Sequence, residues 1–274
     1  MKKVKIKWKN IIIVLIFILS IVGLIIALYN IGVWKKDSDN TSKEIKELQK
    51  TTEVIEVKDS INTEIIEQVE EVPKFNPYWD YIKMSLIDVD FNELKKTNSS
   101  VAGWIKVNGT NINYPFVHTK DNKYYLTHSF DKSYNTAGWV FLDYRNSKDK
   151  LSKNNILYAH GRFDNTMFGT LRKILVNGWT QNKDNHVIKM STETENTLWQ
   201  VFSVYRIPNT NDYIQVDFKD NNEFLDFANM LLNRSQYKFE TTVSKEDIIL
   251  TLSTCYNDDE KMVVHAKLIK KEKK

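Results

Sequence analysis

The stretch Ile248-Ile249-Leu250-Thr251-Leu252-Ser253-Thr254-Cys255 is the strongest fold signal in the chain. Its residues are mostly apolar or β-branched up to the cysteine, which is typical of a buried strand. The polar, turn-like residues 256–259 follow, and residues 262–269 then predict a second strand. The stretch therefore predicts a pair of strands with Cys255 at the end of the first, where a substrate can reach it.

Further strands are predicted on the N-terminal side of this pair. Asn108-Gly109 is a strong turn signal between the first two of them. The predicted strands cover residues 101–107, 112–117, 138–143, 155–159, 186–190 and 198–207. Helical periodicity is found over residues 78–96, 167–176 and 222–232. This pattern predicts a mainly β domain, either a closed barrel or a strongly bent sandwich, with a few helices.

The N-terminus predicts a membrane anchor. Five Lys among the first ten residues precede nineteen uncharged residues, 11–29, which would rise about 28 Å as a helix. The lysines are expected to stay cytoplasmic and to place the rest of the chain outside the cell. We therefore expect a cytoplasmic basic tail (1–10), a transmembrane signal anchor (11–33), a solvated extracellular stalk (34–75) and a C-terminal domain (76–274). A cleaved secretory signal is the alternative, and it also exports the domain.

Composition excludes several classes of protein. The chain has 274 residues, of which 42% are hydrophobic and 27% charged, so it is not a disordered protein. A single Cys excludes a disulfide framework and a multi-thiolate zinc site. The formal charge of +4 comes from lysines at the two ends, and the residues between them are net acidic. No nucleic-acid-binding surface is indicated.

The lone Cys255 is either a small core residue or a nucleophile, and its place at a strand end in an exported protein favours the nucleophile. A thiol nucleophile needs a partner that moves protons. The histidines available are His118, His128, His160, His186 and His265. His160 is favoured ahead of His128, because it follows a predicted strand and precedes Gly161 in a loop.

Several segments resemble class B sortases, the membrane-anchored cysteine transpeptidases of Gram-positive bacteria. The segment Thr251-Leu252-Ser253-Thr254-Cys255 resembles their TLxTC signature, and Tyr158-Ala159-His160-Gly161 resembles their Tyr-Gly-His segment, with Ala159 where Gly is more usual. Further similar segments follow the same order, at residues 103–107, 112–115, 124–126, 141–146 and 167–171. The helix predicted over 222–232 is also similar to that class, so the resemblance covers about residues 78–270.

The resemblance implies an eight-stranded closed β-barrel with N-terminal helices and a helical insert before the nucleophile strand. It implies a transpeptidase that cleaves a C-terminal sorting signal, Asn-Pro-x-Thr-Asn-like or related, after its Thr. Cys255 would hold the acyl group as a thioester, and His160 would protonate the leaving amine and then deprotonate the incoming one. The implied partners are secreted proteins bearing the signal and a peptidoglycan precursor amine, with no metal or cofactor. Ser253 and Thr254, beside the nucleophile, are candidates for substrate binding.

The chain departs from the family at one catalytic position. The family's third catalytic group is an Arg on the strand after the Cys, but all five Arg of this chain precede Cys255, and Lys261 stands at the matching place. The short connection predicts that Lys261 faces Cys255. Lys supplies the charge of Arg but not its two-donor fork. The alternative is that Lys261 is only a solvated loop residue. In that case Arg206 or Arg162 is the candidate for the role of the family's Arg.

Two other functions stay open at this point. Without the family's Arg, the domain can be a silent module that binds sorting signals and does not cleave them. It can also be a surface cysteine peptidase that hydrolyses its substrate and joins nothing to it.

Overall fold

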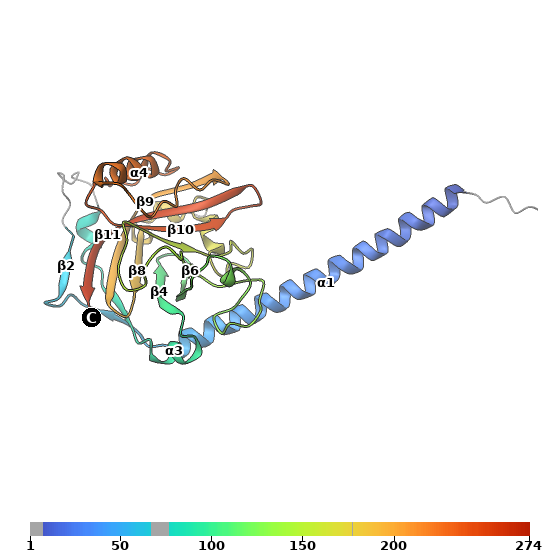
Figure 1. The fold of residues 1–274 in the computed structure, drawn as a ribbon, viewed down its shortest axis with the longest axis horizontal. Helices are drawn as coiled ribbons and strands as arrows, with labels where there is room; N and C mark the ends of the chain where they lie inside the picture. The colour runs from blue at the N-terminus through green and yellow to red at the C-terminus, as the bar shows by residue number, and fades with distance from the viewer. Residues whose placement is uncertain (1–7, 67–76, 177) are drawn as a thin grey trace, which may run out of the picture.

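Strand β10 (Ile249–Cys255) pairs with two neighbours and closes the sheet on itself (Figure 1). The computed structural model describes residues 8–66, 77–176 and 178–274. In it, β10 is parallel to β7 (Asn154–Tyr158) and antiparallel to β11 (Glu260–Lys273). The order β10-β7-β6-β5-β4-β8-β9-β11 returns to β10, so these eight strands form a closed barrel. This is the barrel that the family resemblance implies, and it excludes the bent sandwich that the residue pattern alone left open. The other barrel strands are β4 (Val101–Val107), β5 (Asn113–His118), β6 (Phe141–Leu142), β8 (Val187–Ser191) and β9 (Glu195–Pro208).

The two faces of β10 pack against different cores. Leu250 and Leu252 are fully buried in the main cluster, together with the large ring of Trp199. Ile249, on the opposite face, packs in a second cluster with residues of α4 (Asn221–Asn233), the helical insert predicted over 222–232. Asp220 caps this helix by accepting hydrogen bonds from the backbone N–H groups of the next turn. Alternation along the strand therefore places Cys255 on the face that α4 partly covers.

Two helix predictions are wrong in detail. Residues 78–96 contain α2 (Tyr78–Tyr81) and α3 (Asn92–Thr97), but between them lies a strand, β3 (Leu86–Val89), which pairs with β1 (Val54–Val57). The apolar side chains of β3 are buried against the barrel, and this packing overrides the helical spacing. Residues 167–176 contain only a 3₁₀ helix, η2 (Gly169–Lys173). The other 3₁₀ helices are η1 (Tyr124–Leu126), η3 (Trp179–Gln181) and η4 (Lys183–Asn185).

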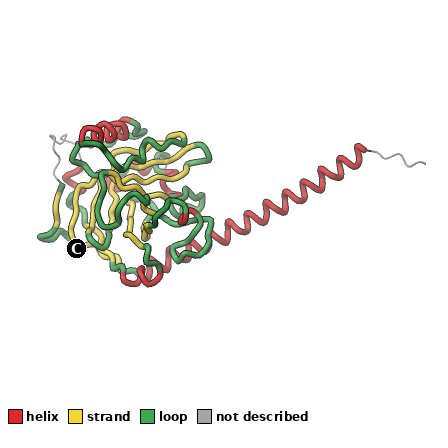
Figure 2. The backbone as a smooth tube through the Cα atoms, in the orientation of Figure 1, coloured by secondary structure: helices red, strands yellow, loops and turns green. Residues whose placement is uncertain are grey.

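The N-terminal segment forms one continuous helix, α1 (Trp8–Thr51), which extends away from the barrel in Figures 1 and 2. By length and composition its apolar first half can cross a membrane, and the large apolar side chains there are exposed. The prediction of a solvated stalk fails for the second half, because Asp37, Ser38, Thr41 and Leu48 are buried against the domain. Next, β1 pairs with β3, and β2 (Thr63–Ile65) extends the sheet beside β11. The remainder of the predicted stalk, 67–75, lies outside the described residues.

Glu44 has an unusual environment in this docked part of α1. Its carboxylate accepts a hydrogen bond from the backbone N–H of Asp131 at 2.9 Å. Burial outweighs that bond and raises the pKa of Glu44 to about 7 from its ordinary value of 4.5. Between these two pH values the folded chain therefore keeps a proton that the unfolded chain has lost, so the free energy of unfolding falls as the pH rises.

We expect Glu44→Gln to remove the decrease in unfolding free energy with rising pH. Gln keeps an oxygen that accepts the hydrogen bond from the backbone N–H of Asp131, and it carries no charge. The variant should exceed the wild type in unfolding free energy by about 1–3 kcal/mol at pH 8 and differ little at pH 4.5. Denaturant unfolding of the detergent-solubilised protein at both pH values measures this. The exposed Glu47 lies on the same helix, and Glu47→Gln is the control. A gain that is the same at both pH values would contradict the assignment.

Candidate active site

Cys255 is exposed at the end of β10. The parallel register of β10 and β7 runs to the pair Ser253 and Tyr158. Cys255 is the last residue of β10, two residues after Ser253, and His160 lies just past the end of β7, two residues after Tyr158. The backbone N–H of Ala159 still donates to the carbonyl oxygen of Ser253 at 3.4 Å, so the two chain segments stay side by side beyond the last strand pair. Gly161 brings the two strand ends close together, because a Cβ at this position would clash with the carbonyl oxygen of Cys255.

The imidazole of His160 is held by the loop that precedes β6. Its Nε2 lies 2.8 Å from the carbonyl oxygen of Leu126. A carbonyl only accepts hydrogen bonds, so Nε2 carries a proton and Nδ1 is the ring atom left for proton exchange. Gly138, with φ of 62°, packs against the ring, since a Cβ there would lie 3.1 Å from Cδ2 of His160.

The other four histidines lie elsewhere in the fold. Burial lowers the pKa of His265 to about 3, and its ring is bonded to Tyr205 and Thr251. Burial also lowers the pKa of His186, whose Nε2 contacts the carbonyl oxygen of Thr180. His128 stacks on Tyr124 at 4.0 Å, and His118 ends β5. His160 is therefore the histidine that the parallel pairing of β7 and β10 brings beside Cys255.

Lys261 lies opposite Cys255 in the β10–β11 pairing, as the sequence predicts. Its Nζ is 3.1 Å from Sγ of Cys255. The connecting turn is fixed by Asn257, whose side-chain oxygen accepts from the backbone N–H groups of Asp259 and Glu260. An ammonium group in this position stabilises negative charge on the sulfur or on an oxygen that forms beside it.

The two arginines considered as replacements for the family's Arg are engaged elsewhere. Arg162 is buried and forms an ion pair with Asp164 at 3.0 Å. Arg206, on β9, lies 4.3 Å over the ring of Tyr256 and 3.7 Å from the carboxylate of Glu260. Neither has a described contact with Cys255, so Lys261 is the cation that the structure brings to the sulfur.

Arg172 is a residue that the sequence reasoning missed. Its guanidinium donates to the carbonyl oxygen of Tyr256 at 2.9 Å and to that of Gly161 at 3.2 Å. It also lies 4.0 Å over the ring of Phe163. Arg172 thus joins the loop after Cys255 to the loop after His160. Its position in a predicted helix gave no sign of this role.

Ser253 and Thr254, predicted from the sequence as candidates for substrate binding, are not exposed beside Cys255. Both side chains are buried. The hydroxyl of Ser253 lies 2.9 Å from that of Tyr213, and the Thr254 hydroxyl donates to the carbonyl oxygen of Ala159 at 2.7 Å. These bonds hold β10 to the segment after β9 and to β7, so the two residues support the frame of the site.

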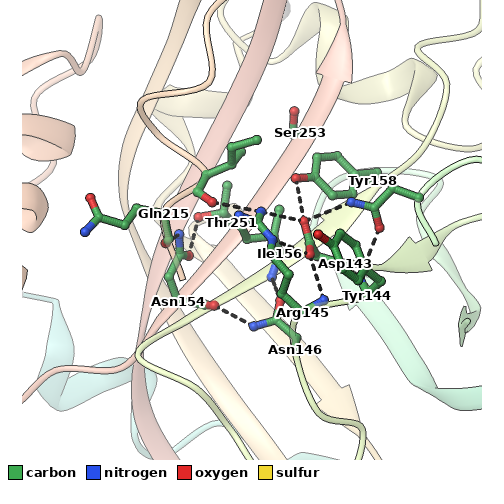
Figure 3. A network of polar contacts seen from close by, with 12 residues as sticks. Asp143, Tyr144, Arg145, Asn146, Asn154, Ile156, Tyr158, Gln215, Thr251 and Ser253 are labelled. Atoms are coloured by element: carbon green, nitrogen blue, oxygen red, sulfur yellow. Dashed lines mark hydrogen bonds and ion pairs between the residues drawn. The ribbon is translucent and has the colours of Figure 1, made fainter. Parts of the chain in front are cut away.

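A polar network around Asp143 joins β7 and β10 to the segment before α4 (Figure 3). Asp143, after β6, is fully buried and accepts hydrogen bonds from Arg145, Tyr158 and Asn122. Burial acts to raise the pKa of Asp143, but these bonds outweigh it and hold the pKa below its ordinary value. Arg145 also donates to the carbonyl oxygen of Ile214, which ties the network to the segment between β9 and α4.

Asn154 and Thr251 extend this network along β7 and β10. The Asn154 side chain donates to the carbonyl oxygen of Gln215 at 2.9 Å and accepts from the Thr251 hydroxyl at 2.7 Å. The segment 213–215 is therefore held against the face that carries Cys255, at several points that lie far apart in the sequence. Among the described residues, no cluster of His, Cys, Asp and Glu side chains is arranged to hold a metal ion.

Comparison with known proteins agrees with this geometry. A family model described as the sortase domain matches residues 105–269. The chain is 35% identical to sortase B of Staphylococcus aureus over 184 residues, which is 66% of this chain and 75% of that protein. It is similar to a crystal structure of Bacillus anthracis sortase B in complex with AAEK1, at a TM-score of 0.67, with 33% identity, covering 86% of this chain and 99% of the other. A Staphylococcus aureus sortase B–substrate complex gives a TM-score of 0.61 and 34% identity, covering 66% and 84%.

We expect Arg172→Ala to release the loops after Cys255 and His160, because two backbone carbonyls lose their donor. The unfolding free energy should fall by about 1–3 kcal/mol. Lys173→Ala, at the exposed neighbouring position, should change it by less than about 0.5 kcal/mol. Hydrogen exchange should also rise in residues 161–166 and 256–259 of the Arg172 variant. Unchanged exchange in both segments would show that Arg172 does not hold them.

Proposed function

This chain belongs to the sortase family and is a sortase-type transpeptidase, and we propose that it cleaves a C-terminal sorting signal of secreted proteins after a Thr residue. The signal is Asn-Pro-x-Thr-Asn-like or related, and the released acyl group is joined to an amine of a peptidoglycan precursor. The observation that carries this proposal is the position of Cys255, exposed with Lys261 Nζ 3.1 Å from its sulfur and His160 after the adjacent parallel strand.

In the first half of the reaction, Sγ of Cys255 attacks the carbonyl carbon of the substrate Thr as a thiolate. The charge that develops on the carbonyl oxygen is stabilised by the ammonium group of Lys261. The carbon–nitrogen bond then breaks, and the leaving amine takes a proton from His160. Since Nε2–H is bonded to Leu126, Nδ1 is the atom that passes this proton. The product is a thioester on Cys255 and a neutral imidazole.

In the second half, the acceptor amine attacks the thioester carbonyl. His160 takes a proton from the attacking amine and so returns to its charged form. The carbon–sulfur bond breaks, and Cys255 leaves as a thiolate beside Lys261. Both groups are then in their starting state, so one proton cycles on His160 with each turnover.

We also propose that α1 crosses the membrane once, with the lysine-rich N-terminus in the cytoplasm and the barrel outside the cell. The support is the charge asymmetry about the uncharged span 11–29. A substrate with a C-terminal sorting signal and a peptidoglycan precursor both lie on that outer side, so this orientation brings all the reactants together.

We expect wild-type protein mixed with a panel of sorting peptides to form a covalent acyl-enzyme, visible by mass spectrometry, and an amide product when triglycine is added. Cys255→Ala should form no adduct, because the chain has no other thiol. His160→Ala should slow turnover by about 10²- to 10⁴-fold, which is typical for loss of a general acid.

The products also separate the alternative functions. Free acid that forms in the presence of triglycine, without amide, would indicate a hydrolytic peptidase. Binding of peptide without cleavage would indicate a silent module. An adduct that persists in Cys255→Ala would rule out Cys255 as the nucleophile.

We expect Lys261→Ala to slow acylation by roughly ten- to a thousand-fold, because loss of one oxyanion donor costs about 2.7–4 kcal/mol in other enzymes and Lys offers a single donor. Lys261→Arg is the matched variant, and it should keep or raise the rate because it restores a two-donor cation. Single-turnover acylation, followed by mass spectrometry, gives both rates. Normal acylation by the Ala variant would show that Lys261 is only a loop charge.

A further inference from the structure

The membrane-proximal part of α1 contacts two loops of the barrel domain through polar side chains. Asp37 accepts a hydrogen bond from the backbone N–H of Thr136 at 3.0 Å, and a second from the Thr136 hydroxyl. One helical turn later, the Thr41 hydroxyl accepts from the side chain of Asn135 at 3.0 Å. These residues lie on one helix face at i, i+4 spacing, and both are buried.

The same helix face reaches a second loop. The Ser38 hydroxyl donates to the carboxylate of Asp164 at 2.5 Å. Asp164 also pairs with Arg162 and accepts from the backbone N–H of Thr166. Burial opposes ionisation of Asp164, but the bonds from Ser38, Thr166 and Arg162 outweigh it and lower its pKa to about 2. The carboxylate is therefore charged at neutral pH, where it accepts the hydrogen bond from Ser38.

The first loop contacts the imidazole of His160, and the second begins directly after His160. In the first, Asn135 N–H donates to the carbonyl oxygen of Thr127, and Gly138 N–H donates to that of Asn135. This loop thus carries at one end the Leu126 carbonyl that binds Nε2 of His160, and at the other Gly138, which packs on the ring. The second loop, 161–166, leaves directly from His160, and Phe168 N–H returns to the His160 carbonyl oxygen.

We propose that Asp37 and Ser38 are positioning residues for His160, which fix from the anchor helix the two loops between which its imidazole lies. The role of His160 in this statement rests on the proposed function. Because α1 is continuous from the apolar span to Ser38, the anchor and the catalytic histidine form one rigid unit, and the site keeps a fixed orientation to the membrane. A flexible stalk would not give this coupling.

The test uses the full-length protein in lipid nanodiscs with Asp37→Ala and its matched control Asp39→Ala, an exposed Asp on the same helix. Asp37→Asn keeps an acceptor oxygen for Thr136 and should restore the wild-type behaviour. We expect Asp37→Ala to lower kcat for a sorting peptide about tenfold, with KM unchanged, since small displacements of a catalytic group are costly. Asp39→Ala should match the wild type.

Hydrogen exchange provides a readout that does not depend on turnover. In Asp37→Ala, amides in 126–138 should exchange about tenfold faster, while β8 and β9 stay unchanged. Ser38→Ala should have the same effect on 161–168. If the wild type cleaves no peptide, the proposed function fails, yet the exchange data still decide whether α1 holds these loops.

Several outcomes would overturn the positioning role. One is unchanged exchange in both loops. Another is an equal effect of Asp37→Ala and Asp39→Ala. A third is a lower unfolding temperature in Asp37→Ala with kcat unchanged at a temperature where the variant is folded, because that would show a purely structural contact.

Discussion

The pairing of β10 with both β7 and β11 is the constraint on which the rest of the site depends. Because β7 runs parallel to β10, their carboxyl ends share one edge of the barrel, and His160 and Cys255 follow the last paired residues there. Because β11 is antiparallel to β10, its first residues lie at the same edge, and Lys261 is placed beside the sulfur. These backbone hydrogen bonds also close the barrel over its core. Cys255 and Lys261 are therefore placed by the strand pairing that closes the barrel, whereas His160 lies just beyond it.

The polar network around Asp143 shows how a buried carboxylate is stabilised. Asp143 is fully buried, and an isolated carboxylate there would be very costly. Arg145, Tyr158 and Asn122 satisfy its oxygens, and Arg145 passes the connection to the segment before α4. The network thus joins a turn after β6 to a segment about 70 residues away. Hydrogen bonds have preferred directions, so this network fixes the segment 213–215 beside β10 more specifically than apolar contacts would.

Compared with the Arg that the family resemblance implies at this position, Lys261 keeps the positive charge and differs in how its donors are arranged. The strand register places its Nζ at the sulfur, so the positive charge is present there. An ammonium group offers point-charge stabilisation, whereas a guanidinium also fixes direction through two parallel donors. Arg172 and Arg206 both contact Tyr256, the next residue after Cys255, but Arg172 is bonded to backbone carbonyls and Arg206 pairs with Glu260. Arg172 therefore fixes the position of the loop after Cys255, and Lys261 places a positive charge beside the sulfur.

Local patterns in the sequence determined the apolar span near the N-terminus, the strand that ends in Cys255, most other barrel strands and the insert α4. Each of these elements is predicted by a pattern within one short segment, either hydrophobic periodicity or a run of uncharged residues. Only the tertiary structure decided that residues 86–89 form a strand, that Asp37 and Ser38 dock on the domain, and that Arg172 joins two loops. In these cases the deciding partner lies far away in the chain, and a polar residue has the same local pattern whether it meets water or a distant hydrogen-bonding group.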